Sequence, residues 1–268
     1  FGPVLDSIAN KYPSVFDGNC KIMKGEKLHI EVDPSAVPIS TGASRAIPEP
    51  LLPALKKELD TLLAQGIIES VEEATPWLHP IVLAPKKGTS DVRLCVDFSK
   101  LNKHVIRPVN AQPTPWEVVR KIPKRTRHFA VFDALKGYHQ IELDEESKNL
   151  TAFLTPFGRY RYLRLPFGLN LAGDCFSKRY GDAVDPVPDT KRVVEDTLIL
   201  GGTSAQLAER TEQFIKVCSE NNITLNLRKV QWDCPEVLFG GFIVDSEGYK
   251  IDPSLSEALR NFPTPKNI

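Results

Sequence analysis

The sequence has very little methionine and no long apolar run. Met23 is the only methionine among 268 residues, and the chain begins at Phe1, so we expect it to be cut from a longer protein. No apolar run approaches the ~20 residues that a bilayer-spanning helix needs, which excludes a membrane span. No basic stretch followed by an apolar stretch marks a secretory signal.

Cysteine is also sparse and shows no metal-ligand spacing. The chain has five cysteines, none of them in a CxxC pair. An odd number at scattered positions predicts reduced, mostly buried thiols in a cytosolic setting and argues against a zinc site. The five are Cys20, Cys95, Cys175, Cys218 and Cys234.

An excess of charge of either sign is missing as well. The sequence has 34 Lys and Arg against 34 Asp and Glu, with 41% hydrophobic and 25% charged residues. This is an ordinary globular composition, which excludes disordered, collagen-like and coiled-coil chains. The length allows one or two domains. A net charge of zero speaks against a nucleic-acid partner, but only if the charges are evenly spread.

The charges are not evenly spread. Between His79 and His128 lie eleven basic and three acidic residues, a local charge of +8, so the rest of the chain carries −8. Such asymmetry is typical of a protein that holds polyanions in one part and metal ions in another. The alternative is a hairpin whose surface is merely solvated by Lys and Arg.

Periodicity predicts a mixed α+β fold. Leucines at three- and four-residue spacing predict a helix over 51–65, with Gly66 as its stop. Strands are expected over 80–84, 92–98 and 128–133, the first two joined by a hairpin loop.

The second half of the chain continues the mixture. Residues 193–200 read as two short apolar arms around an acidic turn, 205–221 as a helix, and 223–250 as further strand material. Hairpins and helices that intermix favour α+β over a doubly wound parallel sheet.

Three carboxylates stand out by their context. Asp133 ends an apolar strand, and Glu195 and Asp196 lie between the two apolar arms. An acidic pair at a buried hairpin tip is costly unless a cation compensates it, and hard oxygen ligands suit Mg²⁺. Taken alone, the acidic pair could equally be a solvated turn.

An ordered series of blocks resembles the reverse transcriptase of gypsy-type long-terminal-repeat retrotransposons, from about Val15 to Ile268. The blocks are 63–69, 76–87, 93–98 with 101–102, Phe132-Asp133 with 137–141 (motif A), 165–170 (motif B), 193–196 (motif C), 225–227 with Lys229 (motif D), 240–242, and 261–267. Their common order makes a chance similarity very improbable.

The resemblance implies a polymerase right-hand fold of the α+β class: an antiparallel palm sheet backed by helices, a fingers subdomain, and a thumb that is largely absent. Independently of the resemblance, the Pro-, Gly- and Ser-rich composition of residues 1–49 indicates a lead-in or linker that packs on the surface. Fingers would come from 50–130 with about 150–165, the palm from 131–149 and 166–251, and the start of the thumb from 252–268.

The resemblance also implies roles for individual acids. Asp133 would ligate metal and Ala134 would offer its backbone carbonyl. Asp196 would be the second catalytic acid of motif C, and Glu195 occupies the position of the first. The cofactor would be two Mg²⁺ ions, with Mn²⁺ as an alternative.

Other residues would hold nucleotide, template and primer. Arg93 would clamp the incoming triphosphate, and Lys87, together with Lys86, would reach its γ-phosphate. Tyr138 would crowd the sugar 2′ position and so select deoxynucleotides. Phe167 and Gly168 would pack under the nascent base pair and template, and Phe239, Gly240 and Gly241 would steer the primer end. On residue type alone, Tyr138 could be an ordinary half-buried aromatic and Arg93 a surface residue.

The sequence departs from the family pattern at motif C. Glu195 stands where the family has aspartate, and the extra methylene moves the carboxylate by roughly 1.5 Å, whereas Mg²⁺ tolerates little departure from octahedral geometry. We therefore expect weakened or lost catalysis. Val193 replaces a tyrosine, and Ala172-Gly173-Asp174 departs from an Ala-Pro sequence that many relatives carry after motif B.

The resulting hypothesis is an RNA-directed DNA polymerase fragment that adds deoxynucleotides to a primer 3′-hydroxyl on an RNA or DNA template. Implied partners are template with primer, deoxynucleoside triphosphates, and the protease, RNase H and integrase domains of a parent polyprotein, with no membrane. The implied location is a cytoplasmic virus-like particle. The alternatives are a catalytically inactive nucleic-acid-binding remnant and a structural module of a polyprotein. A hydrolase is disfavoured because no Gly-x-Ser-x-Gly motif is present.

Overall fold

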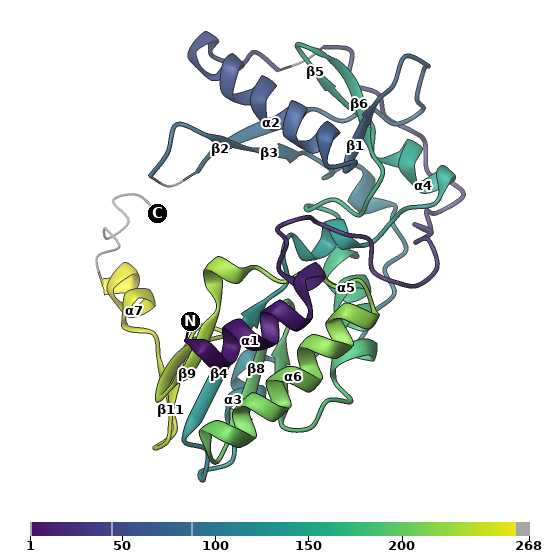
Figure 1. The fold of residues 1–268 in the computed structure, drawn as a ribbon. Coiled ribbons are helices and arrows are strands. Elements are labelled where there is room, and N and C mark those ends of the chain that lie inside the picture. Colours follow the sequence, from purple (N-terminus) through teal and green to yellow (C-terminus); the bar gives the residue numbers. More distant parts are fainter. Residues whose placement is uncertain (1, 44, 87, 261–268) are drawn as a thin grey trace. The chain divides into compact units, whose positions relative to one another are not determined.

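The chain forms two compact units, each built from separate stretches of sequence. The computed structural model describes residues 2–43, 45–86 and 88–260. Unit 1 consists of Phe1–Gly18, Ala111–Leu135 and Arg179–Ile268, and unit 2 consists of Asn19–Asn110 and Lys136–Lys178. The backbone therefore passes from one unit to the other four times (Figure 1).

A four-stranded antiparallel sheet is the centre of unit 1, with strand order β7-β8-β4-β9. The strands are β7 (Thr190–Val193), β8 (Asp196–Gly201), β4 (His128–Asp133) and β9 (Gln231–Cys234). Five of the six residues of β4 are buried, as expected for an inner strand whose two faces are both covered.

Alternate residues of β4 and β8 point to opposite faces, and each face has its own cover. Phe129, Val131, Leu198 and Leu200 pack with residues of α3 (Pro115–Val119) and of the β10–β11 hairpin. Phe132 lies on the other face, where its ring is 5.5 Å from that of Phe214 in α6 (Ser204–Glu220). The period of two in the sequence therefore produces a two-sided core.

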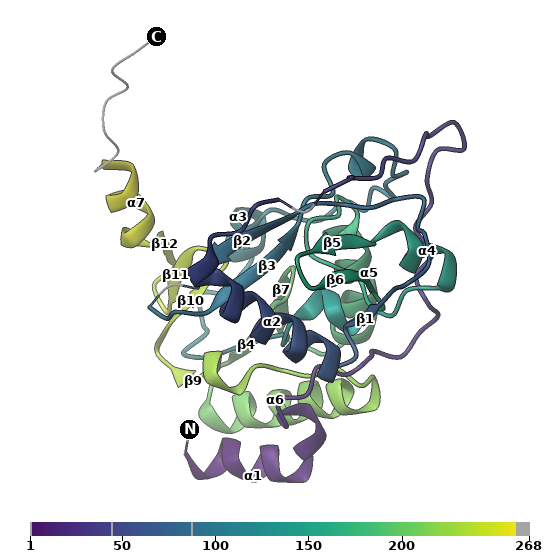
Figure 2. The same cartoon turned by 90° about the horizontal axis from the view of Figure 1, so that it is seen from above.

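Helix α6 covers that second face. The side chains that it buries are those whose spacing in the sequence predicts the helix. Its buried residues recur at three- and four-residue intervals, and the Thr203 hydroxyl caps its first turn by accepting a bond from Gln206 N. Helix α1 (Pro3–Lys11) lies along α6 (Figure 2) and is tied to it by an ion pair between Lys11 and Glu212. The buried residues of α6 are Leu207, Thr211, Phe214, Ile215 and Cys218.

A second sheet of unit 1 contributes to the first face. Its strands are β10 (Glu236–Phe239), β11 (Phe242–Asp245) and β12 (Tyr249–Ile251), all antiparallel neighbours, and α7 (Pro253–Arg260) follows. Val237, Phe239 and Val244 enter the same cluster as the strands of the central sheet. Unit 1 therefore has one continuous core between its two sheets.

Unit 2 holds two smaller antiparallel sheets and a helix. One sheet has the order β1 (Ile68–Ser70), β6 (Gly158–Tyr162), β5 (Phe153–Thr155), and the other pairs β2 (Ile81–Pro85) with β3 (Val92–Val96). Helix α2 (Leu52–Ala64) packs against β3 and ends where Gly66 takes φ +63°. The remaining helices are α4 (Glu145–Leu150) in unit 2, α5 (Ala172–Val184), and the 3₁₀ turns Pro13–Val15, Glu49–Leu51, Leu101–Lys103, Gly137–Gln140 and Leu227–Lys229.

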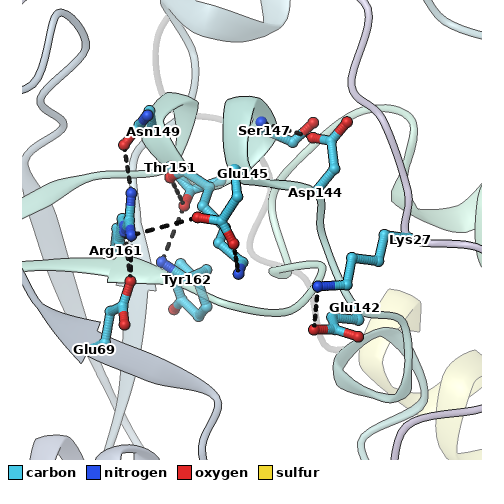
Figure 3. Close-up of polar contacts among 11 residues, drawn as sticks. Lys27, Glu69, Glu142, Asp144, Glu145, Ser147, Asn149, Thr151, Arg161 and Tyr162 are labelled. Carbon is cyan, nitrogen blue, oxygen red and sulfur yellow. Dashed lines mark hydrogen bonds and ion pairs between the residues drawn. The ribbon is translucent and has the colours of Figure 1, made fainter.

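Polar contacts fasten α4 to β6 and to the N-terminal segment (Figure 3). Arg161 of β6 forms ion pairs with Glu69 and Glu145 and donates a 2.6 Å hydrogen bond to Asn149 Oδ1. Lys27 pairs with Glu142 at 3.2 Å. These contacts hold together segments that are 12 to 115 residues apart in sequence, which local propensity alone would not bring together.

The segment expected to be a lead-in is built into both units. Leu5, Ile8 and Val15 are buried in unit 1, and Cys20, Met23 and Ile30 are buried in unit 2. In unit 2 the buried Arg164 guanidinium donates to the backbone carbonyls of four residues, which joins this segment to the end of α2. The acceptors are Cys20, Gln65, Gly66 and His139.

The helices and strands expected over 51–65, 80–84, 92–98, 128–133 and 205–221 are present within two residues of these limits. The acidic turn expected within 193–200 is shifted, because Asp196 already pairs with Val193 and begins a strand, which leaves Val194 and Glu195 as the turn. Residues 111–130, expected with the fingers, belong to unit 1. The subdomain limits themselves stay a prediction, and the block 261–267 lies outside the described residues. No helix in the described ranges is long and apolar enough to cross a membrane, and none of the five cysteines forms a disulfide in the part of the chain that the structure describes.

Unit 2 should lose stability in mild acid through His139. This ring is buried, its Nδ1–H donates a 3.0 Å hydrogen bond to the Leu165 carbonyl, and burial lowers its pKa to about 4. The unfolded chain binds the proton near pH 6.5 while the folded chain does not, so stability is full above that pH and falls below it. We expect a loss of about 1 kcal/mol between pH 7 and 5.5 in urea unfolding.

His139→Gln should flatten this slope, whereas His104→Gln, at a half-buried histidine, should leave it in place. An unchanged slope in His139→Gln would contradict the assignment.

Candidate active site

The pairing of β4 with β8 brings two of the predicted acids together. In this register Asp133 lies opposite Asp196, as the last residue of one strand and the first of the other. Asp133 is only 8% exposed. Backbone bonds fix both ends of the site: Ala134 N donates to the Glu195 carbonyl at 3.2 Å, and Asn226 N donates to the Asp133 carbonyl at 2.8 Å.

Glu195 lies in the tight turn that joins β7 to β8. Val193 pairs with Asp196, so Val194 and Glu195 are the only residues of the turn. Val194 takes φ +51°, which is unfavourable for a β-branched residue. Backbone strain of this kind persists only where the surroundings enforce it, and it is concentrated at functional sites.

Arg192 and the end of α5 supply that enforcement. The Arg192 guanidinium binds both carboxylate oxygens of Asp185, at 2.9 and 3.1 Å, and donates to the Val194 carbonyl at 3.4 Å. A Cβ at Gly181 would come within 2.9 Å of the Asp185 carboxylate and closer still to the guanidinium, so only glycine leaves room for this pair. The β7–β8 turn is therefore held in place by Arg192 through its ion pair with Asp185 at the end of α5.

A second contact joins α5 to the first strand residue beyond the acids. The Tyr180 hydroxyl and the Thr197 hydroxyl are 2.8 Å apart, and both residues are fully buried. Thr197 follows Asp196 directly, so this contact fixes the start of β8.

The electrostatics of the acids are unfavourable without a cation. Burial, together with the neighbouring carboxylates of Asp133 and Glu195, raises the pKa of Asp196 to about 6. Lys229 Nζ lies 3.0 Å from Asp133 Oδ2 and opposes this effect. One ammonium group thus faces three carboxylates, which leaves the site with a net negative charge.

This donor set fits a hard divalent cation. Mg²⁺ prefers carboxylate and carbonyl oxygens and is often held by one or two carboxylates plus substrate phosphates. Asp133 and Asp196 supply such carboxylates from two rigid strands. Among the described residues no group of three His, Cys, Asp or Glu side chains is arranged as a ready metal site, so Glu195 does not complete one with them.

The glycine hairpin packs beside the acidic turn. Gly240 and Gly241 form the two-residue connection between β10 and β11, with φ +58° and +82°, as a type I′ turn requires. A Cβ at Gly240 would lie 3.2 Å from Pro115 Cβ and 3.4 Å from Val193 Cγ2. Phe239 is 1% exposed, so it acts through packing and not through direct contact with a ligand.

In unit 2 the structure brings together the two aromatic residues implied at the nucleotide. The rings of Tyr138 and Phe167 have centroids 4.7 Å apart, and Phe167 is 51% exposed. Gly168, at φ +97°, follows them and accepts a 2.8 Å bond from Asn102 Nδ2. Asp174, in the stretch that departs from the family pattern, is buried in an ion pair with Arg107.

The implied phosphate-binding cations lie on the β2–β3 hairpin of unit 2. Arg93 is exposed on β3. Lys86 is engaged with Glu58 at 3.0 Å. Lys87 lies outside the described residues.

Three contributors to the acid site were not among the predicted site residues. Lys229 stood only within the motif D block, and its sequence position gives no sign that it reaches Asp133. Val194 stood only within the motif C block, and Arg192 had no signal, because a positive φ and a bidentate pair with Asp185 are products of tertiary structure.

Replacing Asp196 with asparagine should stabilise the fold in metal-free buffer. A carboxyl group whose pKa is raised opposes folding when it is ionised at pH 7, so removing the charge should raise the unfolding free energy by about 1 kcal/mol after solvent screening. Added Mg²⁺ should then stabilise the natural chain more than Asp196→Asn, because cation binding favours the folded state. Equal unfolding midpoints of the natural chain and Asp196→Asn without metal would contradict this expectation. The control is Glu247→Gln, which removes a carboxylate from an exposed turn and should leave the midpoint unchanged.

The two turn glycines should differ in their response to alanine. Both take a left-handed φ, so each substitution should cost about 1–2 kcal/mol. Gly240→Ala should cost about 1 kcal/mol more, because its Cβ meets Pro115 and Val193 while that of Gly241→Ala meets only Leu255 at 3.5 Å. Urea unfolding of both variants measures the difference, and equal losses would show that the contacts are unimportant.

Known proteins resemble this chain in sequence. A family model described as reverse transcriptase (RNA-dependent DNA polymerase) matches residues 84–244, more than half of the chain. The retrovirus-related Pol polyprotein from transposon 297 of Drosophila melanogaster is 31% identical over 217 residues, which are 79% of this chain and 20% of that polyprotein. The corresponding polyprotein from transposon gypsy of the same species is 29% identical, over 79% of this chain and 21% of its own length.

The fold comparison points the same way. A foamy viral protease–reverse transcriptase in complex with RNA/DNA hybrid matches with a TM-score of 0.85 at 21% identity, over 97% of this chain and 35% of that one. The chain spans about a fifth of the length of the transposon polyproteins that it matches. These matches confirm the resemblance predicted from the sequence and the α+β fingers–palm fold, and the chain belongs to the reverse transcriptase (RNA-dependent DNA polymerase) family.

Proposed function

We propose that this chain supplies the fingers and palm of an RNA-directed DNA polymerase that transfers deoxynucleotides to a primer 3′-hydroxyl. The observation that carries the proposal is the register of β4 and β8, which opposes the carboxylates of Asp133 and Asp196 within a site of net negative charge. Such a site is suited to positioning divalent cations and phosphates, and phosphoryl transfer depends mainly on positioning and charge neutralisation.

Asp133 and Asp196, with the backbone carbonyl of Ala134, would hold two Mg²⁺ or Mn²⁺ ions. When bound, the ions would lower the pKa of the primer hydroxyl and neutralise the leaving pyrophosphate. Asp133 must exchange its ion pair with Lys229 for a metal–oxygen bond. Lys229 would then remain beside the site as a cation available to substrate phosphate.

Glu195 would weaken this activity. Its carboxylate is one methylene farther from the backbone than an aspartate would place it. The turn cannot easily move back to compensate, because Arg192 holds Val194 and Ala134 holds the Glu195 carbonyl. A displacement of about 1 Å at a reacting centre can cost ~100-fold in rate.

Other residues would bind substrate as the family resemblance implies. Arg93, Lys86 and Lys87 would contact the triphosphate, and Tyr138, steadied by Phe167, would exclude a 2′-hydroxyl. Gly168 would lie beside the template. At the primer end, Gly240 and Gly241 would approach the strand while the buried Phe239 supports their turn.

The partners would be an RNA or DNA template with primer, deoxynucleoside triphosphates, and the other domains of a retroelement polyprotein. The foamy viral neighbours were solved with double-stranded DNA and with RNA/DNA hybrid, which supports a nucleic-acid partner here. We place the protein in a cytoplasmic particle of such an element.

A second candidate is a nucleic-acid-binding remnant without catalysis. It is favoured by Glu195 at motif C and by the ion pair between Lys229 and Asp133, both of which work against cation binding. Primer extension separates the two candidates.

Glu195→Asp should accelerate primer extension by about 100-fold in Mg²⁺, because it restores the shorter carboxylate in a fixed turn. The gain should be smaller in Mn²⁺ if that ion accepts the longer ligand more readily. The measurement is single-nucleotide addition to a labelled primer on an RNA template.

Glu247→Asp, the same change on an exposed turn, is the matched control and should have no effect. Asp133→Asn should abolish extension in both backgrounds. If the natural chain extends as fast as Glu195→Asp, the proposed impairment is wrong. If neither extends, the remnant is the better description.

A further inference from the structure

Five exposed cations lie between α3 and β4, in the basic loop of residues 120–127. We infer that this loop is a second nucleic-acid contact, a binding surface for single strands that is separate from the acid site. The inference does not depend on polymerase activity. The five cations are Arg120, Lys121, Lys124, Arg125 and Arg127.

The cations of the basic loop are in ion-pair contact with no carboxylate that the structure describes, unlike many other cations of unit 1, and Arg120 and Lys121 act on the Glu117 carboxylate only at longer range. No ion pair within 4 Å involves any of the five. The nearby Glu117 carboxylate is engaged by Thr114, whose N and Oγ1 lie 2.8 and 3.0 Å away. The paired cations of unit 1 include Lys11, Arg192, Arg210, Lys229 and Lys250.

Hydrogen bonds and buried side chains hold the backbone at both ends of the basic loop. Thr126 is 5% exposed, and both its N and its Oγ1 donate to the Pro123 carbonyl, at 3.1 and 2.8 Å. Arg127 N donates to the Gly201 carbonyl at 3.1 Å, and Val118 and Val119 anchor the preceding helix in the core. A backbone that is held in place lowers the entropic cost of presenting these cations to a polyanion.

The basic loop lies at the opposite end of the strand from the acids. It precedes His128, the first residue of β4, whereas Asp133 is the last. Five residue steps at ~3.4 Å separate the two ends by about 17 Å. The cations of the loop therefore do not neutralise the acids and are free for another ligand.

An aromatic side chain beside the loop favours nucleic acid over other polyanions. Trp116 is 48% exposed, and the Arg120 guanidinium lies 4.7 Å from its ring centroid. An exposed indole ring offers a face on which an unpaired base can stack, while guanidinium groups match phosphate oxygens. Stacking together with a line of cations is the usual means of binding single strands.

An adjoining cavity of about 280 Å³ is mixed in charge. Its lining includes the cations Arg120 and Lys124 as well as Asp245, Glu247 and Tyr249. The two carboxylates would repel a free polyphosphate or a dense anionic lipid surface. A nucleic acid can avoid them, because its phosphates can follow the loop while a base amino group faces the acids.

The test is the salt dependence of binding to 12-nucleotide oligoadenylate and oligouridylate, followed by fluorescence anisotropy on the whole chain. The variant is Lys121→Gln/Lys124→Gln/Arg125→Gln, which spares Arg127 because that side chain bonds backbone carbonyls. Affinity at 100 mM salt should fall at least tenfold. The slope of log K against log salt should become shallower by about 2, since each phosphate contact contributes ~0.7.

The matched control is Lys11→Gln/Lys216→Gln/Lys250→Gln, which removes the same charge from exposed positions elsewhere in unit 1. It should change the slope by less than half as much. Equal effects of the two triple variants would overturn the proposal, as would the absence of any binding by the natural chain. Loop-dependent binding of vesicles rich in phosphatidylserine without RNA binding, or displacement of RNA by an equal concentration of polyglutamate, would also overturn it.

Two further variants separate this surface from general charge and from the polymerase site. Trp116→Leu should weaken oligoadenylate binding about tenfold and oligouridylate binding less, with Trp116→Phe largely restoring it. Asp133→Asn/Asp196→Asn should leave oligonucleotide binding unchanged even if primer extension is lost. An oligonucleotide affinity that depends on the acids and not on the loop would contradict the proposal while leaving the polymerase assignment intact.

Discussion

The antiparallel register between β4 and β8 is the constraint on which the rest of unit 1 depends. It places Asp133 opposite Asp196 and at the same time sends Phe129, Val131 and Phe132 to their proper faces. A shift of one residue would reverse the faces and separate the acids. The hydrophobic core therefore fixes the geometry of the acid site, because the register cannot shift without exposing the aromatic residues that stabilise the sheet.

Two features of the acid site are energetically unfavourable, and the packing of the core must offset them. Val194 has an unfavourable φ, and the pKa of Asp196 is raised by burial and by like charges. The ion pair of Arg192 with Asp185 and the hydroxyl contact between Tyr180 and Thr197 hold these features in place from α5. Strain and charge repulsion of this kind are compatible with a site that bound cations and phosphates would stabilise.

Much of the fold could be predicted because its signals are local. The leucine spacing of α2, the apolar run of β4 and the glycine pair of the β10–β11 turn each follow from short-range rules. The structure of the N-terminal segment was harder to predict. Its Pro-, Gly- and Ser-rich composition suggests a linker, yet Met23 and Ile30 are buried by contacts with distant residues, and Arg164 holds its backbone from 144 residues away.

By itself the sequence determined the order of the motifs, the acids themselves and the substitution of Glu195, since these are properties of residue type and spacing. The net charge of zero and the run of eleven cations were also fixed there. Only the tertiary structure decided that Lys229 reaches Asp133, that Arg192 holds the strained turn, and that five of the cations belong with the palm sheet. Those facts depend on side chains from distant segments meeting across a packed core, and no local pattern encodes such a meeting.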